Sequence, residues 1–171
     1  MKVIVTGGSS GVGAALTRIL VSKGHHVFIT GRDAAAMEKL AAECNANKGG
    51  EAGKLHYAQG DVSDATVVSD HFSQALSHFG GSCDALVANA GCSVKRGKLE
   101  DCSEDGYDRV MNTNVKGVFL WLQRVVPHFR ERNAGQVVVT SSVCGVRFTP
   151  THAVYTASKF AVEVCKVTFG E

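Results

Sequence analysis

Five short apolar segments, separated by longer stretches with helical spacing, constrain the fold of this chain more than any other feature. They predict strands at residues 2–6, 26–30, 55–59, 84–89 and 136–141. Several of them are nearly continuous apolar runs, as in strands that are buried on both faces. Strands that alternate with helices along a chain are typical of a parallel sheet covered by helices on both sides. The pattern therefore predicts an α/β fold.

Helices are predicted between these strands. The first covers about residues 11–23, the second begins with Asp33 as its N-cap, and the third begins after Ser63. A long helix is predicted over about residues 103–132. Its apolar stripe has helical spacing and comprises Val115, Val118, Phe119, Leu122, Val125, Val126 and Phe129. This stripe fits either the core or an oligomer interface, and the pattern leaves both open. The polar, Gly-rich residues 44–54 predict a surface loop.

Size and charge exclude several classes of protein. The chain has 171 residues, 44% of them hydrophobic and 20% charged, which fits one globular domain with its own core. The net charge is only +2 and no basic stripe is present, so nucleic acids and acidic membrane surfaces are poor partners. No apolar run has the length of a bilayer, and only two residues precede the first apolar run, so we expect a cytoplasmic protein. The six cysteines and seven histidines lack metal-ligand spacing, and no metal site is expected.

A glycine-rich turn follows the first predicted strand directly. It has the sequence Thr6-Gly7-Gly8-Ser9-Ser10-Gly11-Val12-Gly13 and leads into the first predicted helix. Glycines at 7, 11 and 13 permit a tight turn and let backbone N–H groups approach a pyrophosphate. Glycine-rich turns are often only structural, but the strand before this one and the helix after it favour a dinucleotide site.

Tyr155 and Lys159 are four residues apart, so they lie on one face of a helix. A nearby ammonium favours the phenolate form of a tyrosine, which lets the tyrosine act as a general acid and base. A tyrosine and a lysine at this spacing are more often an ordinary surface pair. The pair therefore needs support from the rest of the chain.

That support comes from the order of several motifs. After the glycine turn, which reads T-G-x-x-x-G-x-G, the chain carries Asp61-Val62, Asn89-Ala90-Gly91, Asn114-Val115-Lys116-Gly117, Ser141-Ser142 and finally Tyr155-x-x-x-Lys159. Taken singly, Asp61 could cap a turn, and Asn89 could satisfy backbone groups at a strand end. Taken in this order, the motifs resemble the short-chain dehydrogenase/reductase family over residues 3–162.

The resemblance implies a Rossmann-type doubly wound parallel sheet and the interconversion of a carbonyl and an alcohol on a small molecule. It implies that Ser142 donates a hydrogen bond to the substrate oxygen, that Tyr155 exchanges its proton, and that Lys159 holds the nicotinamide ribose. It implies that Asn114 positions a water linked to Lys159. Ser141 is the competing serine, and strand alternation would point it to the other face. The implied cofactor contacts are Thr6, Gly7, Ser9, Ser10, Gly11, Val12, Gly13, Arg32, Asp61, Val62, Asn89, Ala90, Gly91, Tyr155 and Lys159.

The end of the second strand predicts the type of nicotinamide cofactor. A carboxylate there binds the ribose 2′-hydroxyl of NAD, whereas an arginine pairs with the 2′-phosphate of NADP. By the resemblance, Gly31 occupies the position of the acid in NAD-selective members, and Arg32 follows it. Asp33 is assigned to the helix N-cap, and Ser10 stands where many NADP-selective relatives have a base. We therefore expect NADP(H) rather than NAD(H).

The chain also departs from the family pattern. Only about five strands are predicted, and the family's C-terminal substrate-loop region has no counterpart in residues 1–171, which form a single dinucleotide-binding domain. We therefore expect low or no turnover from this form. One alternative is an NADP(H)-binding or regulatory module that is catalytically impaired. Another is an interaction fragment, or a homo-oligomer, that uses the 103–132 helix. The substrate itself is not encoded in any motif.

Overall fold

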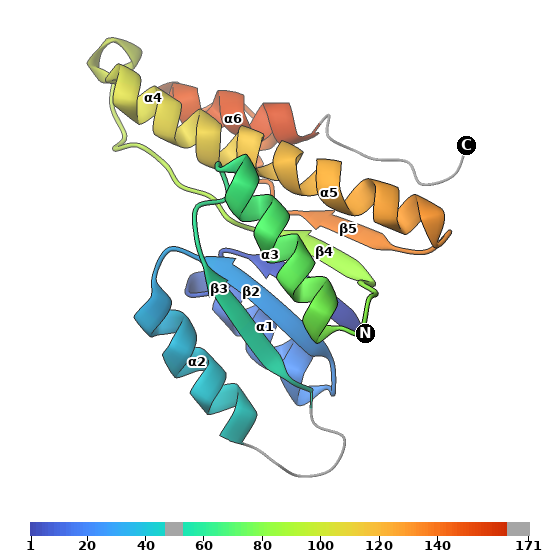
Figure 1. Cartoon of the computed structure of the whole chain (residues 1–171). Helices are drawn as coiled ribbons and strands as arrows, with labels where there is room; N and C mark the ends of the chain where they lie inside the picture. The colour runs from blue at the N-terminus through green and yellow to red at the C-terminus, as the bar shows by residue number, and fades with distance from the viewer. Residues whose placement is uncertain (47–52, 164–171) are drawn as a thin grey trace.

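Five parallel strands form one sheet in the order β3-β2-β1-β4-β5 (Figure 1), in a computed structural model that describes residues 1–46 and 53–163. The strands are β1 (Lys2–Thr6), β2 (His26–Gly31), β3 (Leu55–Gln59), β4 (Ala85–Ala88) and β5 (Gln136–Val139). The helices are α1 (Gly11–Ser22), α2 (Ala34–Ala46), α3 (Ala65–His78), α4 (Glu104–Met111), α5 (Gly117–Glu131) and α6 (Ala153–Glu163). The predicted doubly wound parallel sheet is confirmed.

The strand order reverses at β1, which pairs with β2 on one side and with β4 on the other. In open parallel sheets, the crevice at such a reversal lies at the carboxyl ends of the strands and is the usual place for a ligand. The glycine turn leaves β1 at this edge, and the Asn89-Ala90-Gly91 segment leaves β4 there. The topology thus brings two of the predicted motifs together.

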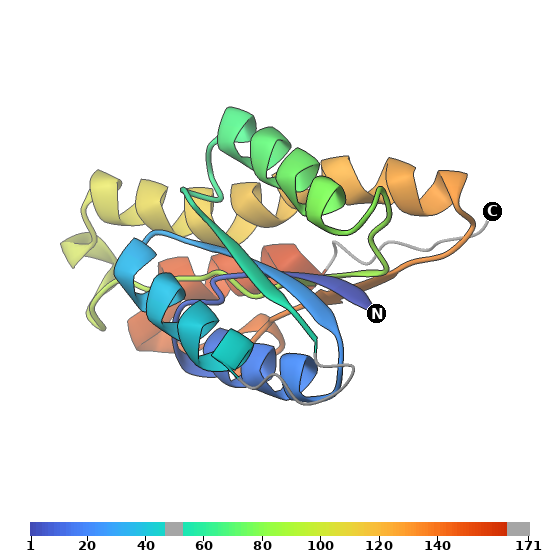
Figure 2. The same cartoon turned by 60° about the horizontal axis from the view of Figure 1, so that its bottom comes forward.

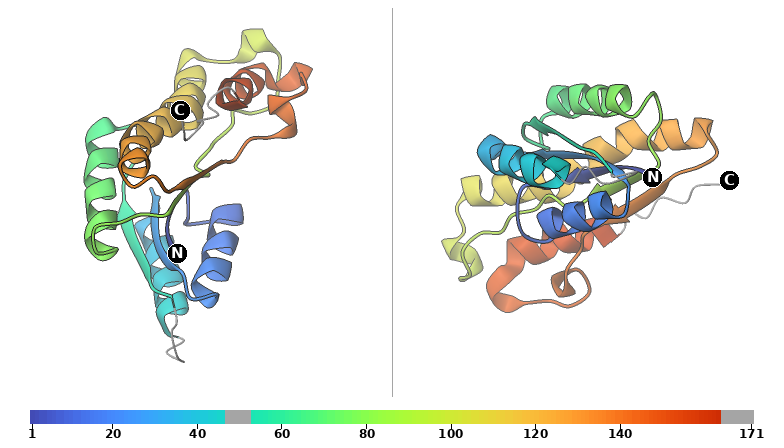
Figure 3. Two further views of the ribbon diagram at one scale, coloured as in Figure 1. Left: turned by 90° about the vertical axis from the view of Figure 1, so that its right-hand side faces the viewer. Right: turned by 90° about the horizontal axis from the view of Figure 1, so that it is seen from below.

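Alternating side chains of the inner strands pack into two separate hydrophobic layers. Val5 and Ile29 face α1 and α2, whereas Ile4, Phe28 and Leu86 face α3 and α5. Figure 2 shows these two pairs of helices on opposite sides of the sheet. Helix α6 lies beside α4 (Figures 1 and 3), and Val162 of α6 belongs to the layer of α3 and α5.

The long helix predicted over residues 103–132 is interrupted. A π-helical turn, Asn112–Lys116, separates α4 from α5, and Ser103 caps α4 by accepting a hydrogen bond from the N–H of Gly106. Most of the predicted apolar stripe belongs to the core, with Phe129 almost fully buried, but Phe119 is 55% exposed. The prediction of one regular helix with a single apolar stripe was therefore wrong. A π-turn contains an additional residue, so the side chains of α5 point in directions that differ from those in an uninterrupted α-helix.

Strand β5 is shorter than predicted and is half exposed. Val138 is in register with Val87, so it points to the face covered by α1 and α2, and it is 54% exposed. None of the helices that the structure describes covers β5 on that face. The predicted loop at 44–54 is also revised in part: residues 44–46 belong to α2, and residues 47–52 lie outside the described residues.

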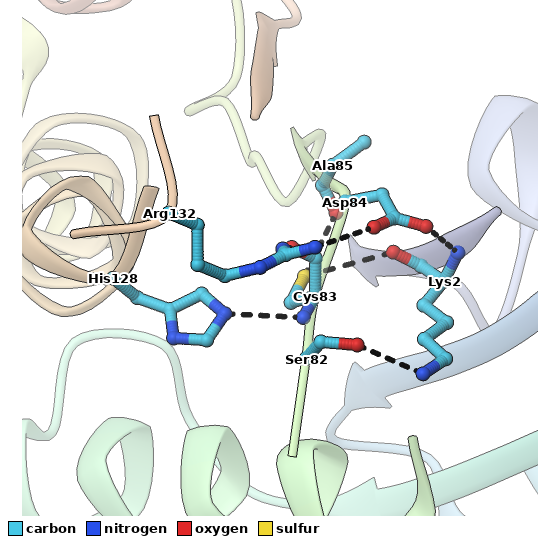
Figure 4. Close-up of polar contacts among 7 residues, drawn as sticks. All are labelled: Lys2, Ser82, Cys83, Asp84, Ala85, His128 and Arg132. Carbon is cyan, nitrogen blue, oxygen red and sulfur yellow. Dashed lines mark hydrogen bonds and ion pairs between the residues drawn. The ribbon is translucent and has the colours of Figure 1, made fainter. Parts of the chain in front are cut away.

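The opposite, amino-terminal edge of the sheet is held by a polar cluster (Figure 4). The Arg132 guanidinium donates to the carbonyl of Cys83 and pairs with the carboxylate of Asp84 at 3.3 Å. The imidazole of His128 accepts a hydrogen bond from the N–H of Cys83 at 3.1 Å, and the N–H of Lys2 donates to Asp84 at 2.8 Å. These contacts fix the end of α5 to the start of β4, far from the carboxyl edge, so we assign them a structural role.

A buried histidine joins the carboxyl ends of β2 and β3. Nδ1 of His71 lies 2.8 Å from the hydroxyl of Thr30, and Nε2 lies 3.2 Å from the carbonyl oxygen of Gln59. Burial lowers the pKa of His71, and the Gln59 carbonyl and the Asp70 carboxylate offset this only in part. His71 is therefore a neutral ring within the folded sheet.

We expect the free energy of unfolding to fall on acidification below about pH 6.5, the ordinary pKa of histidine. The unfolded chain binds protons more tightly than the folded chain there, because the pKa of His71 is lowered only by folding. The contribution of His71 is complete above that pH and decreases below it. Urea unfolding at pH 7.5 and pH 5.5 measures how much the free energy of unfolding falls between the two. The fall should be smaller for His71→Gln than for the wild type. The exposed control His26→Gln should keep the wild-type loss, and equal losses in all three proteins would contradict the assignment.

Candidate functional site

The glycine turn approaches the end of β4 so closely that two of its positions have no room for a side chain. Gly7 has φ +65°, and a Cβ there would lie 2.8 Å from the Cα of Ala90. A Cβ at Gly13 would overlap the carbonyl oxygen of Gly7. Gly11 has space around it but adopts φ +51°, a conformation that favours glycine. The three glycines singled out in the sequence thus serve close approach at two positions and a backbone conformation at the third.

Side chains of Thr6 and Asn89 hold this turn in place. The Thr6 hydroxyl accepts hydrogen bonds from the backbone N–H groups of Asn89 and Ala90, at 3.0 and 2.9 Å. The Asn89 amide donates to the carbonyls of Thr6 and Gly7, at 3.1 and 3.2 Å. Asn89 therefore does satisfy backbone groups at a strand end, and by doing so it sets the floor of the crevice.

A cavity of about 330 Å³ lies along this edge of the sheet. Its lining residues are Gly7, Ser9, Ser10, Val12, Gly31, Arg32, Gly60, Asp61, Val62, Asn89, Ala90, Gly91 and Thr113. Most of the predicted cofactor residues are in this set, but Thr6, Gly11, Gly13, Tyr155 and Lys159 are not. Gly31, Gly60 and Thr113 were not predicted. The positions of Gly31 and Gly60 at the carboxyl ends of β2 and β3 would have indicated the first two.

Charged groups at one end of the cavity have distinct roles. Asp33 accepts a hydrogen bond from the N–H of Ala36 at 2.9 Å, which confirms it as the cap of α2. Arg32 lines the cavity with an exposed side chain. Asp61 accepts from the N–H and the hydroxyl of Ser63. The hydrogen bond from the Ser63 N–H has the largest effect on the pKa of Asp61 and lowers it. The Ser63 hydroxyl and the Arg32 charge lower this pKa further, and partial burial offsets them only in part. Asp61 is thus a carboxylate that both caps a turn and faces the cavity.

Lys159 of α6 lies close to Gly91, which lines the cavity. Its Nζ atom is 5.7 Å from the ring centroid of Tyr155, and a Cβ at Gly91 would lie only 3.7 Å from it. The lysine is 4% exposed and donates to the carbonyl oxygen of Thr140 at 2.8 Å. Burial lowers the pKa of Lys159 below its ordinary value. The structure therefore brings the predicted tyrosine and lysine helix next to the Asn89-Ala90-Gly91 segment.

Asn114 lies in the π-turn and is 1% exposed. Its Oδ1 accepts from the N–H of Cys92 at 2.8 Å, and its Nδ2 donates to the Cys92 carbonyl and to the Ser158 hydroxyl, at 2.9 and 3.0 Å. Ser158 in turn donates to the carbonyl of Tyr155. The amide thus connects the loop after β4 to α6, a role that its sequence motif did not reveal.

Ser141 and Ser142 lie beyond β5, which ends at Val139, so strand alternation does not decide between them. Ser142 caps a short 3₁₀ turn, Val143–Gly145, and its hydroxyl accepts from the N–H of Cys144 at 3.2 Å. The Ser141 hydroxyl is buried without a hydrogen-bond partner among the described residues. It faces Gly145, where a Cβ would lie 2.5 Å away, so it lies against α6.

Residues 1–46 and 53–163 lack two further classes of site. No group of three or more His, Cys, Asp and Glu side chains there is arranged to hold a metal ion. None of the helices in those ranges has the length and apolar character needed to cross a membrane. Arg32 lines the carboxyl-edge cavity and the Lys159 ammonium lies beside Gly91 in its wall, and these two positive charges are suited to an anionic ligand.

Known proteins share this arrangement. The sequence model of a protein family described as short chain dehydrogenase matches residues 1–168. Versicolorin reductase of Emericella nidulans is 35% identical over 162 residues, which cover 94% of this chain and 58% of that protein. The chain spans about three fifths of the length of the curated relatives it matches first.

Solved structures agree with the sequence comparison. An alcohol dehydrogenase from the archaeon Thermococcus sibiricus, complexed with 5-hydroxy-NADP, has a TM-score of 0.88 at 30% identity and covers 96% of this chain and 68% of that chain. A 3-ketoacyl-(acyl-carrier-protein) reductase from Brucella melitensis, complexed with NADH, has a TM-score of 0.86 at 30% identity, with 95% and 65% covered. These neighbours thus include complexes with both types of nicotinamide cofactor.

The three hydrogen bonds of the Asn114 side chain should contribute to the stability of the fold. Asn114→Ala should lower the free energy of unfolding by about 2 kcal/mol, because the backbone groups of Cys92 and the Ser158 hydroxyl lose their partners. Asn112→Ala, an exposed residue of the same π-turn, is the matched control and should change it by less than about 0.5 kcal/mol. Urea unfolding measures both, and equal effects would show that the amide hydrogen bonds contribute nothing specific.

Proposed function

The chain belongs to the short-chain dehydrogenase family, and from this membership we propose that it binds NADP(H) along the carboxyl-edge cavity and interconverts a carbonyl and an alcohol. One observation carries the proposal: Nζ of Lys159 lies 3.7 Å from the Cβ position of Gly91, whose backbone lines that cavity. The residues with acid–base chemistry and the glycine turn therefore belong to one site rather than to two unrelated features.

The residues around the cavity fit a dinucleotide. The backbone is tightly packed at Gly7 and Gly13, and a turn of this kind lets main-chain N–H groups approach a pyrophosphate. The Ser10 side chain makes no capping hydrogen bond to α1, and the first turn of α1 contains no acid. The N–H groups and the positive end of the helix dipole thus face the cavity, as an anionic ligand requires.

The charges next to Gly31 support NADP(H) over NAD(H). The carboxylate of Asp33 is directed to the N-terminus of α2, so it does not compete for a ribose hydroxyl. Arg32 lines the cavity, and among the described residues its side chain is in no ion pair. A guanidinium in this position would bind a 2′-phosphate through paired hydrogen bonds.

Membership of the family supports the chemistry that we propose for the chain's own residues. The nicotinamide, when bound, supplies or accepts the hydride. In the reducing direction Tyr155 donates its hydroxyl proton to the carbonyl oxygen, and in the oxidising direction it accepts the proton of the alcohol. Ser142 donates a hydrogen bond to the same oxygen. Lys159 places a charge beside the tyrosine and the ribose, and Asn114 holds the loop and α6 at a fixed separation.

A cytoplasmic location and a homo-oligomer through residues 103–132 also stay predictions.

Arg32→Gln should weaken binding of NADPH by about tenfold or more and leave NADH binding unchanged, because only the 2′-phosphate pairs with the guanidinium. Titration of the cofactor's fluorescence measures both affinities without turnover. Lys39→Gln, an exposed cation on α2, is the matched control and should not distinguish the two cofactors. An equal loss for both cofactors in Arg32→Gln would refute the assignment of the phosphate to this residue.

Tyr155→Phe should lower the turnover number by about 10²–10⁴, because the ring remains and the exchangeable proton is lost. NADPH affinity should stay within about twofold of the wild type. Oxidation of NADPH over a panel of small aldehydes and ketones measures turnover. Unchanged turnover would remove Tyr155 from the mechanism, and tight binding of NADPH without turnover in the wild type would instead favour the regulatory binding module.

A further inference from the structure

We infer that a second cavity, of about 350 Å³ and next to Tyr155, binds a carboxylate or phosphate group carried by the substrate. This inference rests on the proposed function, since it assigns a substrate class to the same site. The cavity lies between the loop that follows the Asn89-Ala90-Gly91 segment and residues 151–154, which immediately precede Tyr155. It shares no lining residue with the cofactor cavity, so its charges are not used by the dinucleotide.

Positive charge dominates the walls of this cavity. Four cations line it, and Asp101 is the only carboxylate among its described lining residues. The four cations are Lys95, Arg96, Lys98 and Arg109. Lys98 is 3.9 Å from Glu100, and within the described residues the other three make no ion pair. Cations that are gathered without enough acids to balance them favour an anionic ligand. The whole chain is nearly neutral, so this charge is local.

The guanidinium of Arg96 is anchored beside the catalytic tyrosine. Its Nε atom donates to Nε2 of His152 at 3.1 Å, and the His152 ring centroid is 5.8 Å from that of Tyr155. This contact uses one edge of the guanidinium and orients the group, which leaves its terminal N–H groups for a ligand. An arginine held in this way favours paired hydrogen bonds to the two oxygens of a carboxylate or phosphate.

The position of Arg96 sets where the anion lies on the substrate. His152 contacts both Arg96 and the ring of Tyr155, so we place the anion and the reacting carbonyl on one small molecule. The volume is at the lower end of the range for small-molecule sites. We therefore assign the cavity to short keto acids, or to phosphorylated compounds of similar size, rather than to long neutral chains.

Matched probes test this on the chain as it is, with NADP⁺ present. Levulinate carries a ketone and a carboxylate, methyl levulinate has the same ketone without charge, and inorganic phosphate has the charge without the ketone. Backbone amide NMR titrations at constant ionic strength should show saturable shifts at Gly97 and Leu99 for levulinate and none for the ester. Arg96→Gln should weaken levulinate binding by about tenfold or more. The exposed control Lys54→Gln, at the opposite edge of the sheet, should leave it unchanged.

Each outcome is decisive. Equal binding of acid and ester, an unchanged affinity in Arg96→Gln, or binding of neither levulinate nor phosphate would overturn the inference. Arg96→Lys guards against a purely structural effect, since it retains the charge and should bind levulinate better than Arg96→Gln does. A separate NADPH titration distinguishes the two proposals: levulinate binding at Arg96 without NADPH binding would refute the proposed function, whereas NADPH binding without levulinate binding would refute only this inference.

Discussion

The hydroxyl of Thr6 accepts two backbone hydrogen bonds, and the positions of both walls of the cofactor cavity depend on it. Where β1 and β4 end, their N–H groups leave the ladder of the sheet and need new acceptors, because unpaired buried backbone groups are costly. Thr6 supplies one acceptor for two donors, and Asn89 returns donors to the carbonyls of the glycine turn. These hydrogen bonds hold the ends of β1 and β4 at a fixed separation, so the shape of the cavity between them follows from backbone hydrogen bonding.

A second set of hydrogen bonds joins the loop after β4 to α6, the helix that carries Tyr155 and Lys159. The buried amide of Asn114 contacts Cys92 on one side and Ser158 on the other, so the loop after β4 and α6 keep a constant separation. The loop then continues into the wall that holds Arg96. The carboxyl-edge cavity, Tyr155 and the basic wall are thus positioned by short polar links at the carboxyl edge, while the hydrophobic layers fix the sheet beneath them.

Much of this was accessible from the sequence, since local signals decide it. A buried apolar run placed β1 at its observed bounds, the bounds predicted for β3 also match although only Leu55 of that strand is buried, and an aspartate before three alanines identified the cap of α2. Other features depend on contacts between distant segments and have no local signal. The interruption of the long helix at Asn112–Lys116, the end of β5 before Ser141, and the paired contacts of Asn114 belong to this group. The basic cavity is only partly of this kind: Lys95, Arg96 and Lys98 are close together in the sequence, but no local pattern shows that Arg109 and His152 line the same cavity.

The π-turn between α4 and α5 carries a consequence for how this site tolerates changes in chain length. Each residue of a helix turns the chain by about 100°. Deleting a single residue between Asn112 and Lys116 would restore regular α-helical hydrogen bonding, but it would also rotate α5 by that angle relative to α4. Trp121 and Val125 would then leave the hydrophobic layer, or Asn114 would swing away from Cys92. The wide turn thus reconciles two incompatible helical registers, one set by the core and the other by a buried amide.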